Sequence, residues 1–576
     1  MTALLTDNLP LLAGAPNGIK KLRELILELA VRGKLVPQDP NDEPASELLK
    51  RIAEQKARLV AESKIRKQKP LAKIADQEKP FVIPTDWEWV RLDSLLQKIG
   101  AGSTPLGGKQ AYVAKGVKFL RSQNVWNEGL RLNDVAFIPE ATHQKMSGTH
   151  VEAGDLLFNI TGASIGRCAA VPSNFDTGNV SQHVTIIRPV SSNTQPFLHV
   201  VLVSQLVQQT VMDVQVGVSR EGLSIGKLSQ FLIPFPPEAE QHRIVAKVDE
   251  LMALCDRLEA RQADADSAHA QLVQTLLDSL TQARDAEDFA QSWQRLAEHF
   301  HTLFITESSI DALKQNLLQL AVMGKLVPQD PNDEPASELL KRIAKEKSRL
   351  LAEGEIKKQK PIIEISDELK KIDLPAGWEW TRLGSQVIES GAGWSPNCES
   401  RPREDDEWGV LKVSAVSWGV FRPEENKALP VNLNARPEYQ VVEGDFLVSR
   451  ANTTELVARS VVVENTLPRL MLSDKIIRLK LTSLCDRRYV NLVNSAPLAR
   501  AYYSQVAGGT SSSMKNVSRE QMLNLPLALP PLAEQHRIVA KFDQLMTLCD
   551  QLKALLNQAR QIQVQLADAL VEQAVA

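Results

Sequence analysis

The sequence lacks the marks of a membrane protein, a secreted protein or a metalloprotein. No apolar run approaches the ~18 residues that a membrane-spanning helix needs, and the first residues show neither the basic start nor the long apolar segment of a signal peptide. The five cysteines are scattered and never closely spaced, which is typical of reduced thiols and excludes a zinc-finger spacing. The nine histidines form no cluster of the metalloprotease kind. We therefore expect a cytoplasmic protein with no metal site and no membrane contact.

Aromatic residues are few and the net charge is close to zero. Only 5% of the 576 residues are aromatic, so the core must be mainly aliphatic. The 67 basic and 70 acidic residues leave a net charge of −3, which neither favours nor excludes a nucleic-acid partner. At roughly 100–200 residues per domain, a chain of this length comprises several domains.

The motifs of the common enzyme classes are missing. Gly100–Gly102 and Gly391–Gly393 lack the third glycine of a dinucleotide site, and Gly107-Gly108-Lys109 is no phosphate loop because Gln110 stands where Ser or Thr is needed. The chain has no amino-methylation motif, helicase motif, nuclease carboxylate set or nucleophile elbow, although a Ser-His-Asp triad stays open. These absences favour a chain that performs no covalent chemistry by itself.

What the sequence does contain is a long internal repeat. GKLVPQDPNDEPASELLKRIA occupies 33–53 and recurs unchanged at 324–344, and EQHRIVAK occupies 240–247 and 534–541. The stretches between these blocks, which we call the first insert (about 90–230) and the second insert (about 381–525), differ in most positions. A duplicated frame that presents two different reading domains explains this pattern; ordinary duplication with uneven drift is the alternative.

The frame is predicted to be helical. After each EQHRIVAK block, apolar residues recur in alternating steps of four and three, the pattern of a coiled coil. The seam positions are Ile244, Val248, Leu251 and Leu258 in the first copy and Ile538, Phe542, Leu545 and Leu552 in the second. Two helices of ~35–40 residues would bury these seams by packing together antiparallel, in a frame with pseudo-two-fold symmetry. Shorter helices are expected at 18–32, 45–63, 285–303, 308–322 and 336–353.

Each insert is predicted to be a compact α/β domain. Strand-like runs occur at 117–121, 155–160 and 184–188 in the first insert and at 410–413, 445–449, 461–463 and 476–481 in the second. Helix-like stretches follow at 196–214 and 487–506. The expected fold class is α+β, with two α/β domains separated by long antiparallel coiled-coil helices.

Polar and basic loops in both inserts are suited to DNA. Arginine matches guanine O6 and N7, Asn and Gln match adenine, and Lys and Ser match phosphate. The candidates in the first insert are Lys109, Arg121, Gln123, Asn124, Thr161, Ser164, Arg167, Arg220 and Lys227. Those in the second insert are Lys412, Ser414, Arg450, Asn452, Thr453, Ser511, Lys515 and Asn516. Solvated polar loops without a ligand are the alternative interpretation.

Three further motifs bring a known family into view. PPxAEQHRIVAKxDxLMxLCDxL stands in both long helices, Gly-x-Gly-x-x-Pro begins each insert, and GDxL stands at Gly154–Leu157 and Gly444–Leu447. With these motifs and its duplicated frame, the chain resembles the specificity subunits of Type I restriction-modification systems. It is most similar to longer members with an N-terminal copy of the helical repeat.

The resemblance implies a non-catalytic subunit that directs its partners to DNA. Each insert would be a target recognition domain that reads one half of a bipartite, asymmetric site in double-stranded DNA, with half-sites ~10 bp apart. The helices would set the spacer. Two methyltransferase subunits would bind S-adenosylmethionine and flip the target adenine, and two motor/nuclease subunits would use ATP and Mg²⁺. This chain would bind no cofactor or metal itself.

The resemblance also implies five segments. They are an N-terminal helical region at 1–86, the first target recognition domain at 87–235, a central helical region at 236–377, the second target recognition domain at 378–529 and a distal coiled-coil helix at 530–576. Two other functions stay open at this point. One is a non-enzymatic scaffold with two divergent protein-binding modules, and the other is a self-contained DNA enzyme, against which the missing motifs argue.

Overall fold

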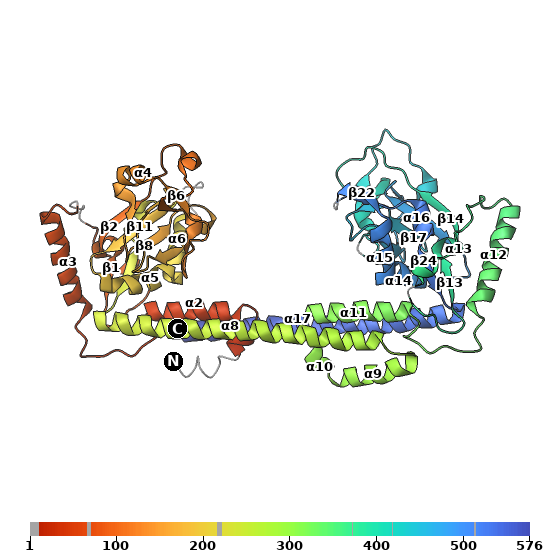
Figure 1. The fold of residues 1–576 in the computed structure, drawn as a ribbon, viewed down its shortest axis with the longest axis horizontal. Coiled ribbons are helices and arrows are strands. Elements are labelled where there is room, and N and C mark those ends of the chain that lie inside the picture. Colours follow the sequence, from red (N-terminus) through yellow and green to blue (C-terminus); the bar gives the residue numbers. More distant parts are fainter. Residues whose placement is uncertain are drawn as a thin grey trace. The chain divides into compact units, whose positions relative to one another are not determined.

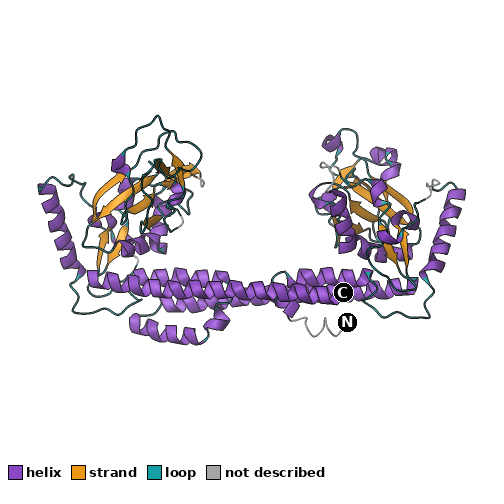
Figure 2. Cartoon of the chain, turned by 180° about the vertical axis from the view of Figure 1, so that it is seen from behind, coloured by secondary structure: helices purple, strands orange, loops and turns teal. Residues whose placement is uncertain are grey.

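The computed structural model describes residues 11–65, 71–215, 222–370, 372–417, 419–511 and 514–575. The chain divides into two compact units, Met1–Ala265 with Ala559–Ala576, and Asp266–Gln558. Both divisions fall inside long helices, α8 (Glu238–Thr281) and α17 (Leu532–Val575), so each unit contains a part of each (Figure 1). The described strands lie within 88–235 and 379–529, one group in each unit (Figure 2).

The frame helices follow the sequence pattern closely. They are α2 (Gly18–Val31), α3 (Ala45–Ala61), α9 (Ala286–Glu298), α10 (Phe300–Leu303), α11 (Glu307–Val322) and α12 (Ala336–Ala352). The stretch 285–303, expected as one helix, is two, α9 and α10. The two long helices span 44 residues each, more than expected, because they begin directly after the proline pairs.

The helices of the inserts are shorter than the sequence predicts. They are α4 (Glu140–Lys145), α5 (Gln195–Val203), α6 (Gln205–Gln215), α7 (Ile225–Leu228), α13 (Leu383–Gln386), α14 (Arg487–Ser495), α15 (Pro497–Val506) and α16 (Arg519–Leu523). The stretch 487–506 breaks at Ala496, which is extended because a residue before proline avoids the helical region. The stretch 196–214 breaks at Ser204, which is also extended.

A third helix packs against the seam in each unit, a contact that the four- and three-residue spacing does not predict. In the first unit, Ile244 and Val248 of α8 share a core with Ile26 of α2 and Ala567 of α17. In the second unit, Ile538 and Leu545 of α17 share a core with α11 and with the end of α8. The remaining seam residues, Leu251, Leu258, Phe542 and Leu552, are partly buried against these cores. Within each unit the start of one long helix therefore packs with the end of the other and with a short helix.

The repeated blocks meet in a buried polar hub that ties frame to insert. In the first unit, Glu240 of α8 is 1% exposed and accepts hydrogen bonds from Trp87 Nε1 (2.9 Å) and Gln38 Nε2 (2.7 Å). Arg243, one turn on, donates to both oxygens of Asp42 (2.6 and 3.1 Å). Burial raises the pKa of Glu240. The GKLVPQDPND block, the EQHR helix and the tryptophan thus form one constellation.

The second unit repeats the hub. Glu534 accepts hydrogen bonds from Trp378 Nε1 (3.0 Å) and Gln329 Nε2 (3.1 Å), and Arg537 donates to Asp333 (2.6 Å). Gly324, at φ +71°, lies so close to Trp378 that a Cβ there would approach its ring to 2.9 Å. Identical sequence blocks are therefore required together, because their side chains satisfy one another.

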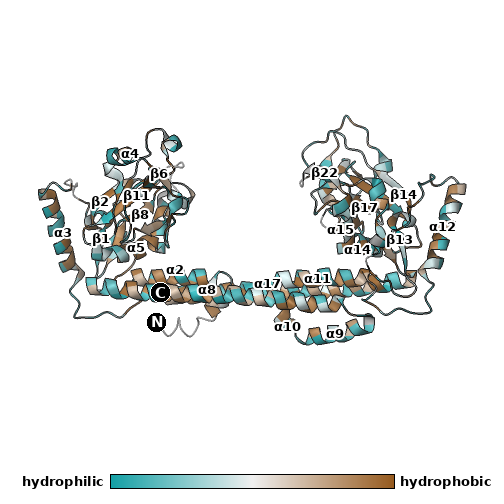
Figure 3. Ribbon diagram, in the orientation of Figure 1, coloured by the Kyte–Doolittle hydropathy of each residue, from teal (hydrophilic) through white to brown (hydrophobic). Residues whose placement is uncertain are grey.

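The two inserts share one sheet plan. The main sheet of the first insert has the order β2-β11-β8-β9, and that of the second has β14-β21-β17-β19. The strands are β2 (Leu96–Ala101), β8 (Leu156–Asn159), β9 (Cys168–Ala170), β11 (Val184–Pro189), β14 (Val387–Ala392), β17 (Phe446–Ser449), β19 (Ser460–Val462) and β21 (Ile476–Leu481). Their side chains are hydrophobic for the most part (Figure 3), and Leu156, Phe158, Leu447 and Leu479 are buried.

A second sheet accompanies each main sheet. It has the order β6-β3-β10-β7 in the first insert and β16-β15-β20 in the second. Its strands are β3 (Val117–Leu120), β6 (Ala136–Ile138), β7 (His150–Val151), β10 (Gly178–Val180), β15 (Gly409–Leu411), β16 (Asn426–Ala428) and β20 (Leu470–Met471). Strand pairs β1 (Glu88–Arg91) with β12 (Leu232–Phe235), and β13 (Glu379–Arg382) with β24 (Pro526–Leu529), close each insert where its chain enters and leaves.

The GDxL motif is explained by a buried ion pair. Asp155, the residue directly before β8, is fully buried. Its carboxylate accepts hydrogen bonds from Arg188 Nε of β11 (2.6 Å) and from the Glu152 backbone N–H (2.8 Å). The second insert repeats this pair with Asp445 and Arg478 (3.1 Å). The motif therefore places a carboxylate that pairs with an arginine of the main sheet in each insert.

None of the described helices is long and apolar enough to cross a membrane.

Candidate nucleic-acid interface

The topology brings the candidate loops of the first insert to one edge of the main sheet. The end of β2 pairs with the start of β11 (Ala101 with Thr185), and the end of β8 pairs with it on the other side (Asn159 with Val184). The second sheet adds the end of β3, where Leu120 pairs with Val180. We call the loops and the hairpin at this edge, 102–111, 121–131, 160–167, 181–183 and 222–227, the first interface.

Hydrogen bonds join these loops to one another. Asn159 is fully buried, and its amide donates to the Ser122 carbonyl (2.9 Å) and to Ser164 Oγ (3.2 Å). Thr161 Oγ1 lies 2.6 Å from His183 Nδ1. The Leu223 backbone N–H donates to the Ile160 carbonyl (2.8 Å). Candidate residues far apart in sequence therefore share one rigid surface.

The candidates at the first interface differ in how free they are. Lys109 and Lys227 are exposed, and their ammonium groups have no partner among the described residues. Arg121 donates to the Asp134 carbonyl (2.8 Å), and Gln123 donates to the Asp134 carboxylate. Arg220 lies outside the described residues.

The side-chain amide of Asn124 forms its hydrogen bonds within its own loop. It is fully buried, its Oδ1 accepts from the Arg121 backbone N–H (3.0 Å), and its Nδ2 donates to the Arg131 carbonyl (2.9 Å) and to Asp134 (3.1 Å). A side chain with all these groups occupied shapes the loop and leaves nothing to offer a base in this conformation.

The second insert has a matching edge. Ala392 at the end of β14 pairs with Ile477, and Ser449 at the end of β17 pairs with Ile476. We call the loops here, 393–408, 412–417, 450–459, 472–475, 508–511 and 514–516, the second interface. Asn452 Nδ2 donates to Ser417 Oγ (2.9 Å), which joins two of them.

A small extra sheet, β18-β23-β22, gathers several candidates of the second interface. Its strands are β18 (Ala451–Asn452), β22 (Gly508–Ser511) and β23 (Met514–Asn516). Asn452 pairs with Lys515, and Ala451 pairs with Asn516, which is exposed. Lys515 Nζ donates to the Gly509 carbonyl (2.8 Å). The backbone of Ser511 ends β22, and its side chain lies outside the described atoms.

Some of the other candidates at the second interface already contact side chains of this protein, and others do not. Lys412 Nζ lies 3.5 Å from Glu425, which also accepts from Ser414 Oγ (2.8 Å). Arg450 is exposed, and its guanidinium has no partner among the described residues. Thr453 is half-buried, beside Asn452, whose Oδ1 accepts from its backbone N–H (2.8 Å).

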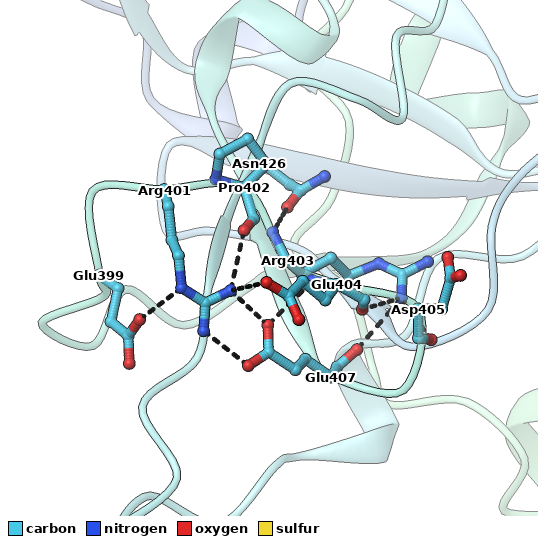
Figure 4. A network of polar contacts seen from close by, with 8 residues as sticks. All are labelled: Glu399, Arg401, Pro402, Arg403, Glu404, Asp405, Glu407 and Asn426. Atoms are coloured by element: carbon cyan, nitrogen blue, oxygen red, sulfur yellow. Dashed lines mark hydrogen bonds and ion pairs between the residues drawn. The ribbon is translucent and has the colours of Figure 1, made fainter.

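An acidic network occupies much of the loop that follows β14 (Figure 4). Arg401 is bonded to both oxygens of Glu407 (2.6 Å each) and to Glu399 (2.9 Å), while Arg403 donates to backbone carbonyls of the same loop. The Arg401 guanidinium, followed by the Glu404 backbone N–H, lowers the pKa of Glu407 to about 2. The guanidinium groups of Arg401 and Arg403 therefore stabilise the conformation of their own loop.

Two tryptophans at the interfaces were not singled out from the sequence. Trp126 at the first interface has the guanidinium carbons of Arg131 and Arg167 at 3.6 and 3.7 Å from its ring centroid. Trp394 at the second has that of Arg436 at 4.1 Å. The sequence shows each of them only as a tryptophan near basic residues. Composition does not distinguish such a tryptophan from one that is buried in the core.

Neither interface contains a cluster of metal ligands in the described part of the chain. The described residues contain no group of three or more His, Cys, Asp or Glu side chains placed to hold a metal ion. What the interfaces offer is hydrogen-bond donors on rigid loops, an arrangement suited to binding.

Comparison with known proteins gives the family. A sequence family described as "Type I restriction modification DNA specificity domain" matches residues 84–265 and 378–561. The chain is 44% identical over 569 residues to the Type I restriction enzyme EcoEI specificity subunit of Escherichia coli, covering 97% of this chain and 94% of the relative. It is 38% identical over 606 residues to the EcoAI specificity subunit of Escherichia coli, with the same coverage.

A solved structure agrees on the fold. It comes from work on complex assembly and conformational transition of the type I R-M system, and its TM-score to this chain is 0.51 at 18% identity. The match covers 86% of this chain and 99% of the other. With two matched DNA specificity domains and relatives of this identity along nearly its whole length, the chain belongs to the specificity subunits of Type I restriction-modification systems.

Proposed function

We propose that each insert is a target recognition domain that reads one half of a bipartite, asymmetric DNA site through its interface. The observation behind this proposal is that equivalent edges of two equivalent sheets present different side chains. Equal scaffolds with unequal loops bind two unequal sequences, so the site is not a palindrome. We place the recognition domains at 87–235 and 378–529, between helical regions at 1–86, 236–377 and 530–576.

Within each interface we assign contact roles to the side chains that remain free. Lys109, Arg167 and Lys227 of the first interface, and Arg450 and Asn516 of the second, offer donors to bases or phosphates. Asn124, Ser164 and Asn452 hold loops together instead. The alternative of a protein-binding scaffold is set aside, because the matched family is a DNA specificity domain.

The subunit acts by directing partners and is not itself the catalyst. We propose that two methyltransferase subunits, which bind S-adenosylmethionine, and two motor/nuclease subunits, which use ATP and Mg²⁺, assemble on it. The seam residues Ile244, Val248, Leu251 and Leu258, with Ile538, Phe542, Leu545 and Leu552, would keep the long helices in register and so set the spacer.

The test is an exchange of one insert. Residues 87–235 are replaced by the matching segment of a relative such as the EcoEI subunit, and methylated adenines are mapped genome-wide in cells that produce the modification enzyme. We expect one half of the methylated site to change while the other half and the spacer stay. Replacement of 378–529 is the matched control and should change the opposite half. Change in both halves from a single exchange, or in neither, contradicts the proposal.

A further inference from the structure

The β4–β5 hairpin of the first interface contains a stack of three residues that no motif predicts. β4 (Val125–Trp126) and β5 (Gly129–Leu130) pair through Trp126 and Gly129. The guanidinium carbons of Arg131 and Arg167 lie 3.6 and 3.7 Å from the Trp126 ring centroid. Two such groups cannot lie so close to one centroid on one face without colliding, so they cover opposite faces of the indole.

Hydrogen bonds hold each residue of this stack in place, through the indole N–H of the tryptophan and through the backbone of the two arginines. Trp126 Nε1 donates to the Gln123 carbonyl (2.8 Å). The Arg131 backbone N–H donates to the Asn124 carbonyl (2.9 Å), and the Asn124 side-chain Nδ2 donates to the Arg131 carbonyl (2.9 Å). The Arg167 carbonyl accepts from the Asn159 backbone N–H (2.8 Å).

A further bond links the two segments that supply the stack. Asn127 Oδ1, at the hairpin tip, accepts from the backbone N–H of Cys168, the residue after Arg167 (3.0 Å). Cys168 is fully buried in β9, so the hairpin is fixed to the main sheet. The stack is therefore preorganised, and its side chains need little further ordering when a ligand binds.

The guanidinium edges remain available. The Arg167 guanidinium makes no hydrogen bond or ion pair to a described residue, and the ring contact uses its face and not its N–H groups. Arg131 makes one ion pair, to Glu128 at 3.7 Å, between side chains that are 57% and 74% exposed. Such an exposed pair is weak and yields readily to a better acceptor.

We propose that Arg131 and Arg167, held flat against Trp126, are specificity-determining residues that read guanine in the half-site of the first insert. A planar fork of donors fixed in orientation matches the O6 and N7 acceptors of guanine in the major groove, and a phosphate needs no such fixed geometry. This inference rests on the proposed function, since it requires the first interface to face DNA.

The experiment compares Arg131→Lys, Arg167→Lys and Trp126→Ala in the subunit assembled with its modification subunit. The lysine variants keep the charge but lose the fork, and Trp126→Ala keeps both arginines but removes their platform. Arg167→Ala, which removes both the charge and the fork, is added to detect a phosphate contact. Arg58→Lys, at an exposed position of α3, is the matched control. Binding is titrated against the native site and against every single-base change in it, at two salt concentrations, and methylated adenines are mapped.

We expect each lysine variant to lose 10- to 100-fold of preference for a G·C pair at one position of the first half-site, with the second half-site and the salt dependence unchanged. Trp126→Ala should relax the same positions; if it unfolds, the lysine variants decide alone. A uniform loss of affinity for all sequences, with a shallower salt dependence in Arg167→Ala, identifies a phosphate contact and overturns the inference. Unchanged specificity overturns it as well.

Two further variants separate this inference from the proposed function. If Lys109→Ala and Arg121→Ala alter the first half-site while the stack variants do not, only the guanine assignment is wrong. If none of these variants, nor the exchange of the insert, alters the site, the first interface itself is not the DNA surface.

Discussion

At the scale of single residues, the hubs explain why widely separated blocks repeat together. The carboxylates of Glu240 and Glu534 are buried, and a buried carboxylate is tolerated only where donors meet its oxygens. Trp87 and Gln38 supply those donors in the first unit, and Trp378 and Gln329 in the second. A change to one member leaves the others unsatisfied.

Trp87→Phe should therefore destabilise the first unit by about 1–3 kcal/mol beyond the loss of ring volume, because Glu240 loses one donor. Trp89→Phe is the matched control: Trp89 is also buried, but its Nε1 has no hydrogen-bond partner among the described residues. Urea unfolding of both variants gives the comparison. Equal free energies of unfolding for the two would contradict the role of the hub.

The Arg401 network predicts a pH dependence of its loop. The pKa of Glu407 is lowered from 4.5 to about 2 in the folded chain, so the folded state favours the charged carboxylate. The contribution of this pair to loop order is complete above the unfolded pKa and is lost as the pH falls from there toward 2. NMR titration of carboxyl-labelled glutamate should find one group with this low pKa, and Arg401→Gln should return it toward 4.5. A Glu407 pKa that ignores this substitution would refute the assignment.

At the scale of elements, the third helix decides how the long-helix seam is buried. α2 joins α8 and α17 in the first unit, and α11 does so in the second. Each insert also packs on the third helix of its unit, since α5 contacts α2 in the first unit and α14 contacts α11 in the second. The short helices are thus the link between the frame and the recognition domains, a role that the heptad pattern alone does not reveal.

Leu317→Ala in α11 should lower the free energy of unfolding of the second unit by about 2–5 kcal/mol, since the side chain is fully buried among three helices and truncation leaves a cavity. Leu272→Ala in the same unit is the control, because Leu272 is 51% exposed and should change stability by less than about 0.5 kcal/mol. Thermal unfolding followed by circular dichroism measures both. A Leu317 variant as stable as the control would argue against a packed third helix.

At the scale of the whole molecule, the first unit combines two segments that are distant in the chain, whereas the second unit is one continuous segment. The first unit needs residues 559–576 from the far end, and the second begins inside α8. The five segments that we propose follow the sequence repeat, whereas the compact units divide within both long helices. Because α8 and α17 are the elements that both units share, their length is the property through which the spacer would be set.

Insertion of one heptad after Ala265 and another after Gln558 should lengthen the DNA spacer by about 3 bp, because seven residues extend a helix by about 10.5 Å and a base pair rises 3.4 Å. The heptad keeps each seam in phase. Insertion of two residues at each position is the control, since it rotates the seams out of register and should abolish assembly. Methylation mapping gives the spacer; an unchanged spacer after the paired heptads would refute the ruler.

The sequence by itself determined the frame and the family. Helix positions, the seams and the repeat follow from periodicity and from identity between the two copies, which are local properties of the chain. Only the tertiary structure decided which candidates are free. In sequence, Asn124 and Lys412 look as suitable as Arg167 and Arg450. In the structure, Asn124 contacts Asp134 and Lys412 contacts Glu425, whereas the guanidinium groups of Arg167 and Arg450 have no acidic partner among the described residues.

The stack on Trp126 likewise forms from two segments some 40 residues apart, Trp126 and Arg131 on one and Arg167 on the other. Availability depends on contacts between loops that meet only when the sheets have formed, and no spacing along the chain encodes them.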